Sequence, residues 1–165
     1  MKKTLAVLMA GIMAVASLTG CGSETSNQAS GDAYKIGVLQ LVEHAALDAS
    51  NQGFVDALND AGIDYVIDQQ NAQNDQTACQ TIAEKLVNDG NDLILAIATP
   101  AAQAVAGITS DIPVVGTAIT DFAASGLVDS NDVPGGNVTG SSDLTPVEAQ
   151  INLLKKVCPD AKTVG

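Results

Sequence analysis

The chain alternates between short apolar segments and longer segments in which apolar residues recur every three or four positions. The short segments predict β-strands, and the third of them, 92–98, is apolar almost throughout, which is typical of a strand covered on both faces. The longer segments predict helices, because their apolar side chains fall on one helical face. The predicted order is strand 34–40, helix 45–61, strand 63–69, helix 75–89, strand 92–98, helix 100–107 and strand 113–118.

Glycines mark the ends of the two longest predicted helices. Gly62 follows the first and Gly90 the second, which suits the left-handed backbone that often closes a helix. After the fourth strand the periodicity weakens: 121–128 predicts a helical turn, and 133–142 a glycine-rich loop that contains at most a short strand.

A further helix begins near residue 145. We expect Thr145 to be the N-cap, Pro146 to occupy the first helical position and Glu148 to complete a capping box. Pro159 ends this helix, and 162–165 resembles the opening of another strand.

Alternating strands and helices of this length predict a parallel sheet between two helical layers. Right-handed crossovers make a doubly wound α/β domain the simplest topology. No internal repeat of fixed period interrupts this pattern.

The amino-terminal segment has a different character. Lys2 and Lys3 precede an uncharged apolar run, 5–18, that is too short to span a bilayer comfortably, so a signal peptide over 1–20 is favoured over a membrane helix. Its end, Leu18-Thr19-Gly20-Cys21, resembles a bacterial lipobox, where a lipoprotein is acylated on the cysteine and cut before it. An ordinary secretory signal with a chance cysteine is the alternative.

The polar segment 21–33, which begins with Cys21, is predicted to be a flexible tether between lipid and domain. Together these features place the mature protein outside the cytoplasm, anchored to the cell membrane by lipid.

The chain is strongly acidic. Its formal charge is −12, and removal of 1–20 with its two lysines leaves −14. Phosphate backbones and anionic headgroups would repel this surface, so nucleic acid is excluded as a partner. Aromatic residues are scarce, so we expect a core of Ala, Val, Leu and Ile.

Cys79, Cys158 and the single histidine, His44, are too dispersed for a metal site, and we expect none. The two cysteines are read as structural thiols, although an exported protein permits a disulfide between them.

Ligands of open parallel sheets bind at the carboxyl ends of the strands. That rule selects the loops 40–48, 99–103 and 117–121. In the second loop Thr99 is expected to cap a helix whose next amides, of Ala101, Ala102 and Gln103, are free to bind an anion. A carboxylate fits better than a polyphosphate because no Lys or Arg is near, and a plain helix cap is the alternative.

The first loop carries three titratable groups, Glu43, His44 and Asp48. They could hold an amine-bearing ligand, serve a hydrolase with His44 as base, or simply cap the helix. Asp121 is similarly either a cap or an ammonium partner. The glycines of 135–140 lack the spacing of a phosphate loop and predict a tight turn.

The ligand-binding residues that we expect come from these three loops. They are Gln40, Glu43, His44, Leu47, Asp48, Thr99, Pro100, Ala101, Gln103, Thr120 and Asp121.

Several short motifs in a fixed order resemble one family, the substrate-binding lipoproteins of ABC importers that include the tryptophan-binding protein of tryptophan/tyrosine importers. The resemblance covers about 34–165. The motifs are Glu43-His44-Ala45-Ala46-Leu47-Asp48, Asn71-Ala72-Gln73, Asp92-Leu93-Ile94, Ile97-Ala98-Thr99-Pro100-Ala101-Ala102-Gln103, Thr120-Asp121 and Pro134-Gly135-Gly136-Asn137-Val138-Thr139-Gly140. Ala45 and Asn74 depart from the family, which often has Pro and Gly at these positions.

This resemblance implies the first lobe of a two-lobe periplasmic-binding-protein fold, with 34–160 as the lobe and 161–165 as the start of a crossover to a missing second lobe. It implies a binding protein without enzymatic activity or cofactor, which traps an amino acid, with aromatic amino acids among the candidates, and hands it to an ABC permease. An extracytoplasmic sensory or receptor-accessory lobe is the alternative function.

Overall fold

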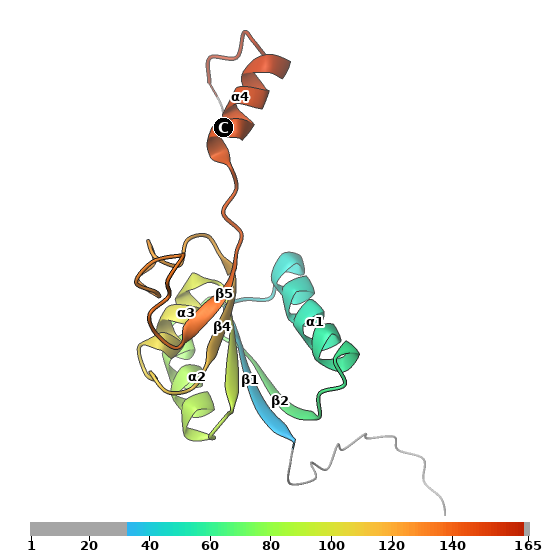
Figure 1. Ribbon diagram of the computed structural model, residues 1–165. Helices are drawn as coiled ribbons and strands as arrows, with labels where there is room; N and C mark the ends of the chain where they lie inside the picture. Colours follow the sequence, from blue (N-terminus) through green and yellow to red (C-terminus); the bar gives the residue numbers. More distant parts are fainter. Residues whose placement is uncertain (1–32, 164–165) are drawn as a thin grey trace, which may run out of the picture.

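The computed structural model describes residues 33–163, and the predicted signal peptide, Cys21 and nearly all of the tether lie outside this range. Five strands and four helices follow one another along the chain (Figure 1). They are β1 Tyr34–Gln40, α1 Ala45–Asp60, β2 Tyr65–Asn71, α2 Gln76–Asn88, β3 Leu93–Ile97, α3 Thr99–Ala106, β4 Val114–Ile119, β5 Val138–Ser142 and α4 Val147–Val157.

All five strands are parallel and lie in the order β2-β1-β3-β4-β5. Because β1 pairs on both sides, its last residue, Gln40, stands opposite Asn71 of β2 and Ile97 of β3. The carboxyl ends of the strands therefore meet at one edge of the sheet, as the doubly wound prediction requires.

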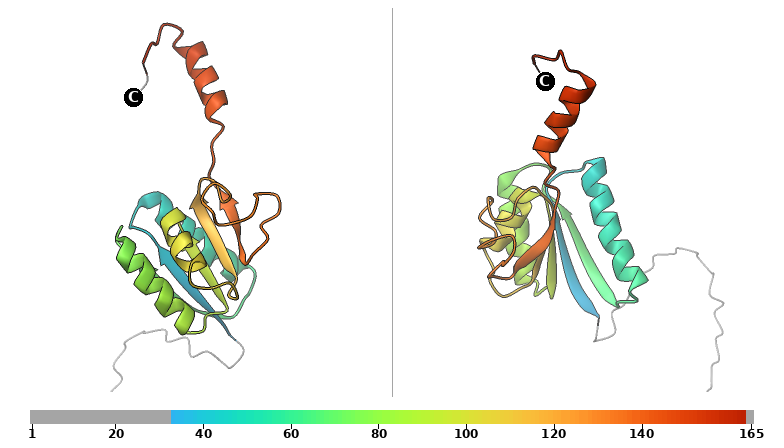
Figure 2. Two further views of the ribbon diagram at one scale, coloured as in Figure 1. Left: turned by 90° about the vertical axis from the view of Figure 1, so that its left-hand side faces the viewer. Right: turned by 45° about the horizontal axis from the view of Figure 1, so that its top comes forward.

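Helices cover both faces of the sheet. Helices α2 and α3 pack on one face and α1 lies on the other (Figure 2). Parallel strands joined by helices in this way form an α/β sandwich, which confirms the predicted fold class.

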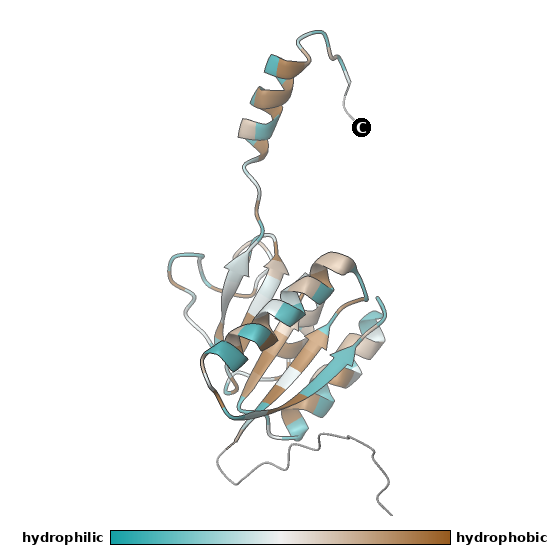
Figure 3. Ribbon diagram, turned by 90° about the vertical axis from the view of Figure 1, so that its right-hand side faces the viewer, coloured by the Kyte–Doolittle hydropathy of each residue, from teal (hydrophilic) through white to brown (hydrophobic). Residues whose placement is uncertain are grey.

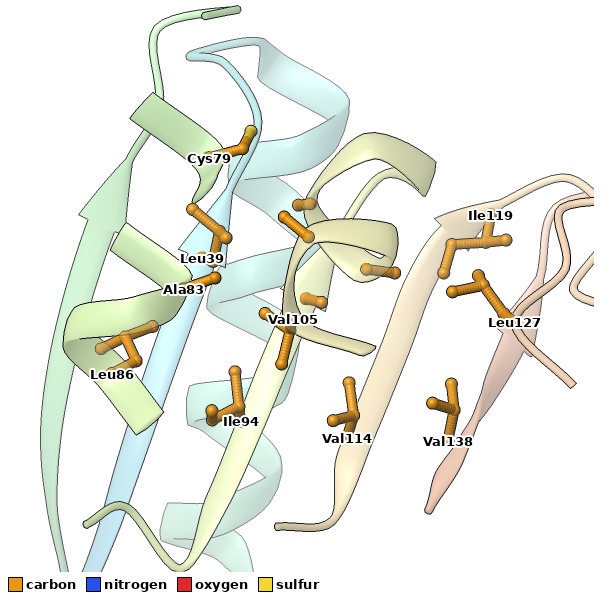
Figure 4. Close-up of a cluster of buried hydrophobic side chains, with 14 of the residues drawn as sticks. Leu39, Cys79, Ala83, Leu86, Ile94, Val105, Val114, Ile119, Leu127 and Val138 are labelled. Atoms are coloured by element: carbon orange, nitrogen blue, oxygen red, sulfur yellow. The ribbon is translucent and has the colours of Figure 1, made fainter. Parts of the chain in front are cut away.

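The larger core lies beneath α2 and α3 (Figure 4). Strand residues such as Leu39 and Ile94 point there and meet Leu86 of α2 and Val105 of α3, and all four side chains are fully buried. The neighbouring strand residues Val38 and Leu95 point to the α1 face instead, because side chains alternate along a strand.

The α1 face is less apolar. Its core consists of three buried strand residues, Val38, Leu95 and Ile97, with Leu47 and Phe54 of α1 packed against them. No residue of α1 itself is buried. Towards β4 and β5 this face carries hydroxyl groups, and the Thr117 and Ser141 oxygens lie 3.3 Å apart.

The glycines expected to end helices do so. Gly62 and Gly90 have positive φ angles of 65° and 68° directly after the C-caps of α1 and α2. Glycine adopts this conformation at little cost because it lacks a Cβ atom.

The short strand foreseen within 133–142 is β5, and it adds an edge to the sheet beside β4. Asn137 anchors its start, because the side-chain amide donates to the carbonyls of Thr109 and Ile112 at 3.1 and 2.7 Å. The glycine-rich segment is thus a turn that leads into a strand, and its φ of 79° at Gly135 is typical of a turn.

Helix α4 stands away from the sheet on an extended connection (Figures 1 and 2). Its N-cap is Pro146, without a side-chain hydrogen bond, so the predicted Thr145 cap and capping box are wrong. No residue of α4 is buried, and several large apolar side chains in α4 and in the connection before it are exposed. They are Leu144, Val147, Ile151, Leu153 and Val157.

Within residues 33–163 none of the helices has the length and apolar character needed to cross a membrane.

Gly140→Ala tests the close approach of β5 to β4. A Cβ atom at Gly140 would overlap the Gly116 carbonyl of the neighbouring strand, and backbone cannot swing aside as a side chain can. We expect the free energy of unfolding, measured by urea titration, to fall by about 2–3 kcal/mol.

Gly53→Ala is the matched control. Gly53 lies inside α1, and a Cβ there would meet nothing within 4 Å. This variant should gain about 0.5–1 kcal/mol through helix propensity. Equal effects of the two substitutions would contradict the packing described for β5.

A surface ion pair links β2 to α2. The Lys85 ammonium contacts the Asp68 carboxylate and, at 2.7 Å, the Asp89 carboxylate. The Lys85 hydrogen bond, aided by that of Gln70 and opposed by partial burial, lowers the pKa of Asp68 below its ordinary value of 3.8.

A lowered carboxyl pKa stabilises the fold above the unfolded value and loses that effect as the pH falls through the folded value. We therefore expect Asp68→Asn to lower the free energy of unfolding by less than about 1 kcal/mol at neutral pH, because the pair is largely exposed. In urea titrations the difference from the unaltered chain should shrink as the pH falls below 3.8 and disappear once the pH is below the lowered pKa of folded Asp68. A difference that persists in strong acid would mean that Asp68 acts by something other than charge.

Candidate functional site

The three loops selected from the sequence meet at the carboxyl edge of the sheet. The Leu41 amide donates to the Ile97 carbonyl at 3.2 Å, which joins the ends of β1 and β3. The Ala98 amide donates to the Thr117 carbonyl at 3.0 Å, which joins the ends of β3 and β4. The loops 40–48, 99–103 and 117–121 are thus neighbours in space.

Unusual backbone conformations gather at this edge. Four non-glycine residues of the described chain have positive φ angles, and each lies at or just after the carboxyl end of a strand. They are Gln73 and Asn74 after β2, Ala98 after β3 and Ala118, the next-to-last residue of β4. Such conformations cost of order 1–3 kcal/mol and concentrate at functional sites, where the surroundings hold them.

The strongest case is Ala98, with φ 82° and ψ 153°, a region that is nearly exclusive to glycine. Ala98 is the N-cap of α3, and no side chain caps this helix. The prediction that Thr99 is the cap is therefore wrong: Thr99 and Pro100 are the first two residues of α3.

Fewer amides are free at the start of α3 than expected. The Ala102 amide donates to the Ala98 carbonyl at 3.1 Å. The Gln103 amide lies in the regular helical ladder, where it bonds four residues back. Since Pro100 has no N–H group, the amides of Thr99 and Ala101 remain.

Two side chains of this loop that were predicted to bind the ligand have other partners. The Ala101 side chain is fully buried in the core beneath α3, so only its backbone can face the edge. The Gln103 side chain donates to the Ser125 carbonyl at 2.9 Å and ties α3 to the turn after β4.

Gln40 occupies the centre of the first loop. Its side chain is 5 % exposed, and its Nε2 donates to the Val42 carbonyl at 2.9 Å and to Asp48 Oδ1 at 2.6 Å. Gln40 therefore holds the loop and orients the Asp48 carboxylate, while the Asp48 residue itself is exposed.

The neighbouring residues have separate tasks. His44 is the N-cap of α1, and its Nδ1 accepts from the Ala46 amide at 3.2 Å, so the capping alternative describes it best. Leu47 packs against the smaller core, and Glu43 is exposed at the edge.

The third loop forms a turn. Asp121 Oδ1 accepts from the Ala124 amide and from Asn131 Nδ2, both at 3.0 Å. These bonds, chiefly that of the Ala124 amide, lower the pKa of Asp121. The Thr120 residue is exposed, and its carbonyl accepts from the Ser142 hydroxyl.

Two hollows of about 270 Å³ each flank the first turns of α1. We call them the polar pocket, on the β2 side, and the hydroxyl groove, on the β5 side. The polar pocket is lined by Gln40, Glu43, Asp48, Asn51, Gln69, Gln70 and Asn71. The hydroxyl groove is lined by Ala46, Leu47, Ser50, Thr117, Ala118, Ser141, Ser142 and Asp143.

Sequence reasoning missed most of these lining residues. The pattern predicts a strand over 63–69, and Asn71 enters only through the motif Asn71-Ala72-Gln73. The four successive polar residues Asp68-Gln69-Gln70-Asn71 at the end of a strand were an available signal. The carboxyl half of β2 is correspondingly hydrophilic (Figure 3). A larger hollow of about 440 Å³ lies at the opposite, amino-terminal end of β2, away from the three loops.

Cys79 is buried and Cys158 is exposed, and both are free thiols. Burial, with the charge of Asp75 as a smaller cause, raises the pKa of the Cys79 thiol, so this group is a structural one. Among the described residues no group of three or more His, Cys, Asp or Glu side chains could hold a metal ion.

The chain resembles proteins of known structure and role. It is 44% identical to the tyrosine-binding protein of Clostridioides difficile over 99% of this chain and 51% of that protein. It is 44% identical, with a TM-score of 0.74, to an ABC domain from Streptococcus pneumoniae in complex with L-Trp, covering 78% of this chain and 44% of that one.

A third similar protein, a substrate-binding protein with adhesive properties from Clostridium difficile in a ligand-free, open structure, is 50% identical with a TM-score of 0.72. The similar region covers 78% of this chain and 45% of that substrate-binding protein. The chain thus spans about half the length of the relatives it matches.

The family model described as "ABC transporter substrate binding protein" matches residues 35–165, which includes every strand and helix apart from the first residue of β1. This match and the identity to the relatives carry the same conclusion: the chain belongs to the family of ABC transporter substrate-binding proteins.

Proposed function

We propose that this chain is the ligand-binding first lobe of a lipid-anchored ABC importer component that captures an amino acid, with aromatic amino acids as the leading candidates. The observation that carries the proposal is the 44% identity, over 99% of the chain, to a protein named for tyrosine binding. The relative in complex with L-Trp supports the same ligand class.

The carboxyl edge offers partners for both charged groups of an amino acid. The free amides of Thr99 and Ala101 lie at the positive end of α3 and suit a carboxylate. Asp48 and Glu43 are the exposed acidic partners for an ammonium group, whereas Asp121 is half-buried and holds the turn after β4 through its Oδ1 atom.

Among the described residues of the three loops, no aromatic side chain is available to stack on the aromatic part of a ligand. Phe122 is 6 % exposed and belongs to the core, so no aromatic ring from the three loops faces the edge. We propose that a second lobe, carried by the other half of the full protein, supplies this pocket and encloses the ligand by closing on the edge.

Helix α4 supports that arrangement. Its exposed apolar residues, Val147, Ile151 and Val157 among them, do not pack on the sheet of this lobe. We propose that they pack against the second lobe, which would move the boundary of the first lobe from residue 160 back to about the end of β5.

Binding of amino acids is tested by NMR titration of the chain with each of the twenty. We expect shifts at the Thr99 and Ala101 amides with an aromatic amino acid, at millimolar affinity, because one lobe leaves the ligand solvated on one side and cannot close. The Clostridioides difficile tyrosine-binding protein, titrated in parallel, should bind far more tightly. The proposal fails if no amino acid moves these two amides at millimolar concentration.

The lipid anchor is tested by Cys21→Ser. Cys21 lies outside the described residues, and its predicted acylation would hold the protein on the membrane through several buried acyl methylenes, each contributing about 0.8 kcal/mol. We expect the unaltered chain in the membrane fraction of a bacterial host and the variant unprocessed or released. Cys158→Ser is the control, and a Cys21→Ser protein that is still processed and membrane-bound would refute acylation.

A further inference from the structure

The connection between β5 and α4 is fastened to the end of β4 where it begins. The hydroxyl of Ser142, the last residue of β5, donates to the Thr120 carbonyl at 2.5 Å. The same oxygen accepts from the Leu144 amide at 3.0 Å, and the Asp143 amide donates to the Ile119 carbonyl at 3.1 Å. We call the two bonds of the Ser142 hydroxyl the Ser142 latch. One side chain thus joins the loop after β4 to the first residues of the connection.

Beyond Leu144 the chain leaves the sheet. Of the hydrogen bonds between described residues, none joins 145–163 to a strand, and no residue of α4 is buried (Figures 1 and 2). The bond at the Leu144 amide is therefore the last fixed point before α4. A change at this point alters the direction in which α4 leaves the lobe.

The end of β4 is irregular at the same place. The pairing of β4 with β5 shifts its register between Gly116 and Ile119, and Ala118 between them has a φ angle of 54°. Irregularities of this kind turn a strand away from its regular course. The bonds of Ser142 are made by an exposed side chain, and a hydrogen bond of this kind changes an equilibrium by only about fivefold. The Ser142 latch can therefore open and close.

The loop that the Ser142 latch holds is 117–121, one of the three loops at the carboxyl edge. The Thr120 residue is exposed, and its backbone carbonyl is the group that the Ser142 hydroxyl grips. A ligand that binds this loop better with the latch closed favours the closed state by that difference in affinity. Contact at the edge would then fix the start of the connection.

We propose that Ser142 is a positioning residue, whose latch couples the ligand loop 117–121 to the direction of α4. This inference rests on the proposed function, because α4 is the element through which a second lobe would be attached. It adds to that function a route by which a ligand on the first lobe influences where the second lobe lies. Ser142 itself need not touch the ligand.

Ser142→Ala removes both bonds of the latch. Because the Leu144 amide loses its acceptor, we expect it to exchange with solvent about fivefold faster, measured by NMR. An unchanged exchange rate would show that the Ser142 latch is not formed in solution.

The direction of α4 is measured with a nitroxide on Cys158, which directly follows this helix. Cys158 is exposed and Cys79 is buried, so residues 21–165 with Cys21→Ser can be labelled selectively. With Ser142 present, the label should broaden one restricted set of amides in the lobe. In Ser142→Ala the broadening should be weaker and spread over more of the lobe. An identical pattern in both proteins would overturn the positioning role, and a loss of stability alone would not change the pattern.

Ser141→Ala is the matched control. It removes the same group from the preceding residue of β5, whose hydroxyl lies 3.3 Å from that of Thr117 and makes no bond to the connection. Leu144 exchange and the broadening pattern should stay as in the unaltered chain. Equal effects of the two alanine variants would indicate general loosening of β5 and overturn the assignment to Ser142.

L-Trp separates this coupling from the proposed function. At millimolar concentration it should slow Leu144 exchange in the unaltered chain and in Ser141→Ala, and not in Ser142→Ala. If L-Trp moves the Thr99 and Ala101 amides but leaves Leu144 exchange unchanged, the coupling is wrong and the proposed function stands. If no amino acid moves these two amides, the proposed function fails, and faster Leu144 exchange in Ser142→Ala would then show a purely structural fastening.

Discussion

The parallel pairing of β1 with both β2 and β3 is the constraint on which the rest of this lobe depends. It brings Gln40, Asn71 and Ile97 into one row, so the loops that follow three strands open at the same edge. Without that register Asp48, Thr99 and the turn after β4 would belong to different surfaces. The same pairing sends alternate residues of β1 into two separate cores, which positions α1 opposite α2 and α3.

The distribution of polar and apolar residues separates the principal core from the polar edge of the sheet. Fully buried aliphatic side chains lie mainly beneath α2 and α3, and these supply the principal core. The α1 face holds a smaller core, and hydroxyl and amide groups flank the first turns of α1 on either side. The face with less apolar burial is thus the one that carries both hollows at the carboxyl edge, where polar groups remain available to a ligand.

The strained backbone conformations also lie at the carboxyl edge of the sheet. Positive φ angles at Ala98 and Ala118, and at Gln73 and Asn74, all fall at the carboxyl ends of strands. Asn74 stands where the resemblance to the family leads one to expect glycine, and asparagine is among the few other residues that enter this region readily. Alanine at 98 has no such advantage, so the surrounding ladder bonds of β3 and β4 must hold it there.

The sequence by itself determined the order of elements, the parallel α/β class and the loops that form the edge, because these follow from periodicity and from the chain direction of parallel strands. It also indicated the family, and the structure and comparisons confirmed that. Element boundaries shifted by a few residues where local signals compete, as at Thr145, whose capping motif is not used.

Only the tertiary structure decided what individual polar residues do. Gln40 and Asp121, both expected to contact the ligand, spend their hydrogen bonds on Asp48 and on the turn after β4, while Asn51 and Gln69 are drawn together from α1 and β2. A polar side chain carries the same donors and acceptors in any sequence, but whether they are satisfied depends on neighbours that are distant along the chain. The sequence therefore predicted the edge at which the three loops meet, and the packing of α1 against the sheet decided which polar side chains there are engaged in hydrogen bonds.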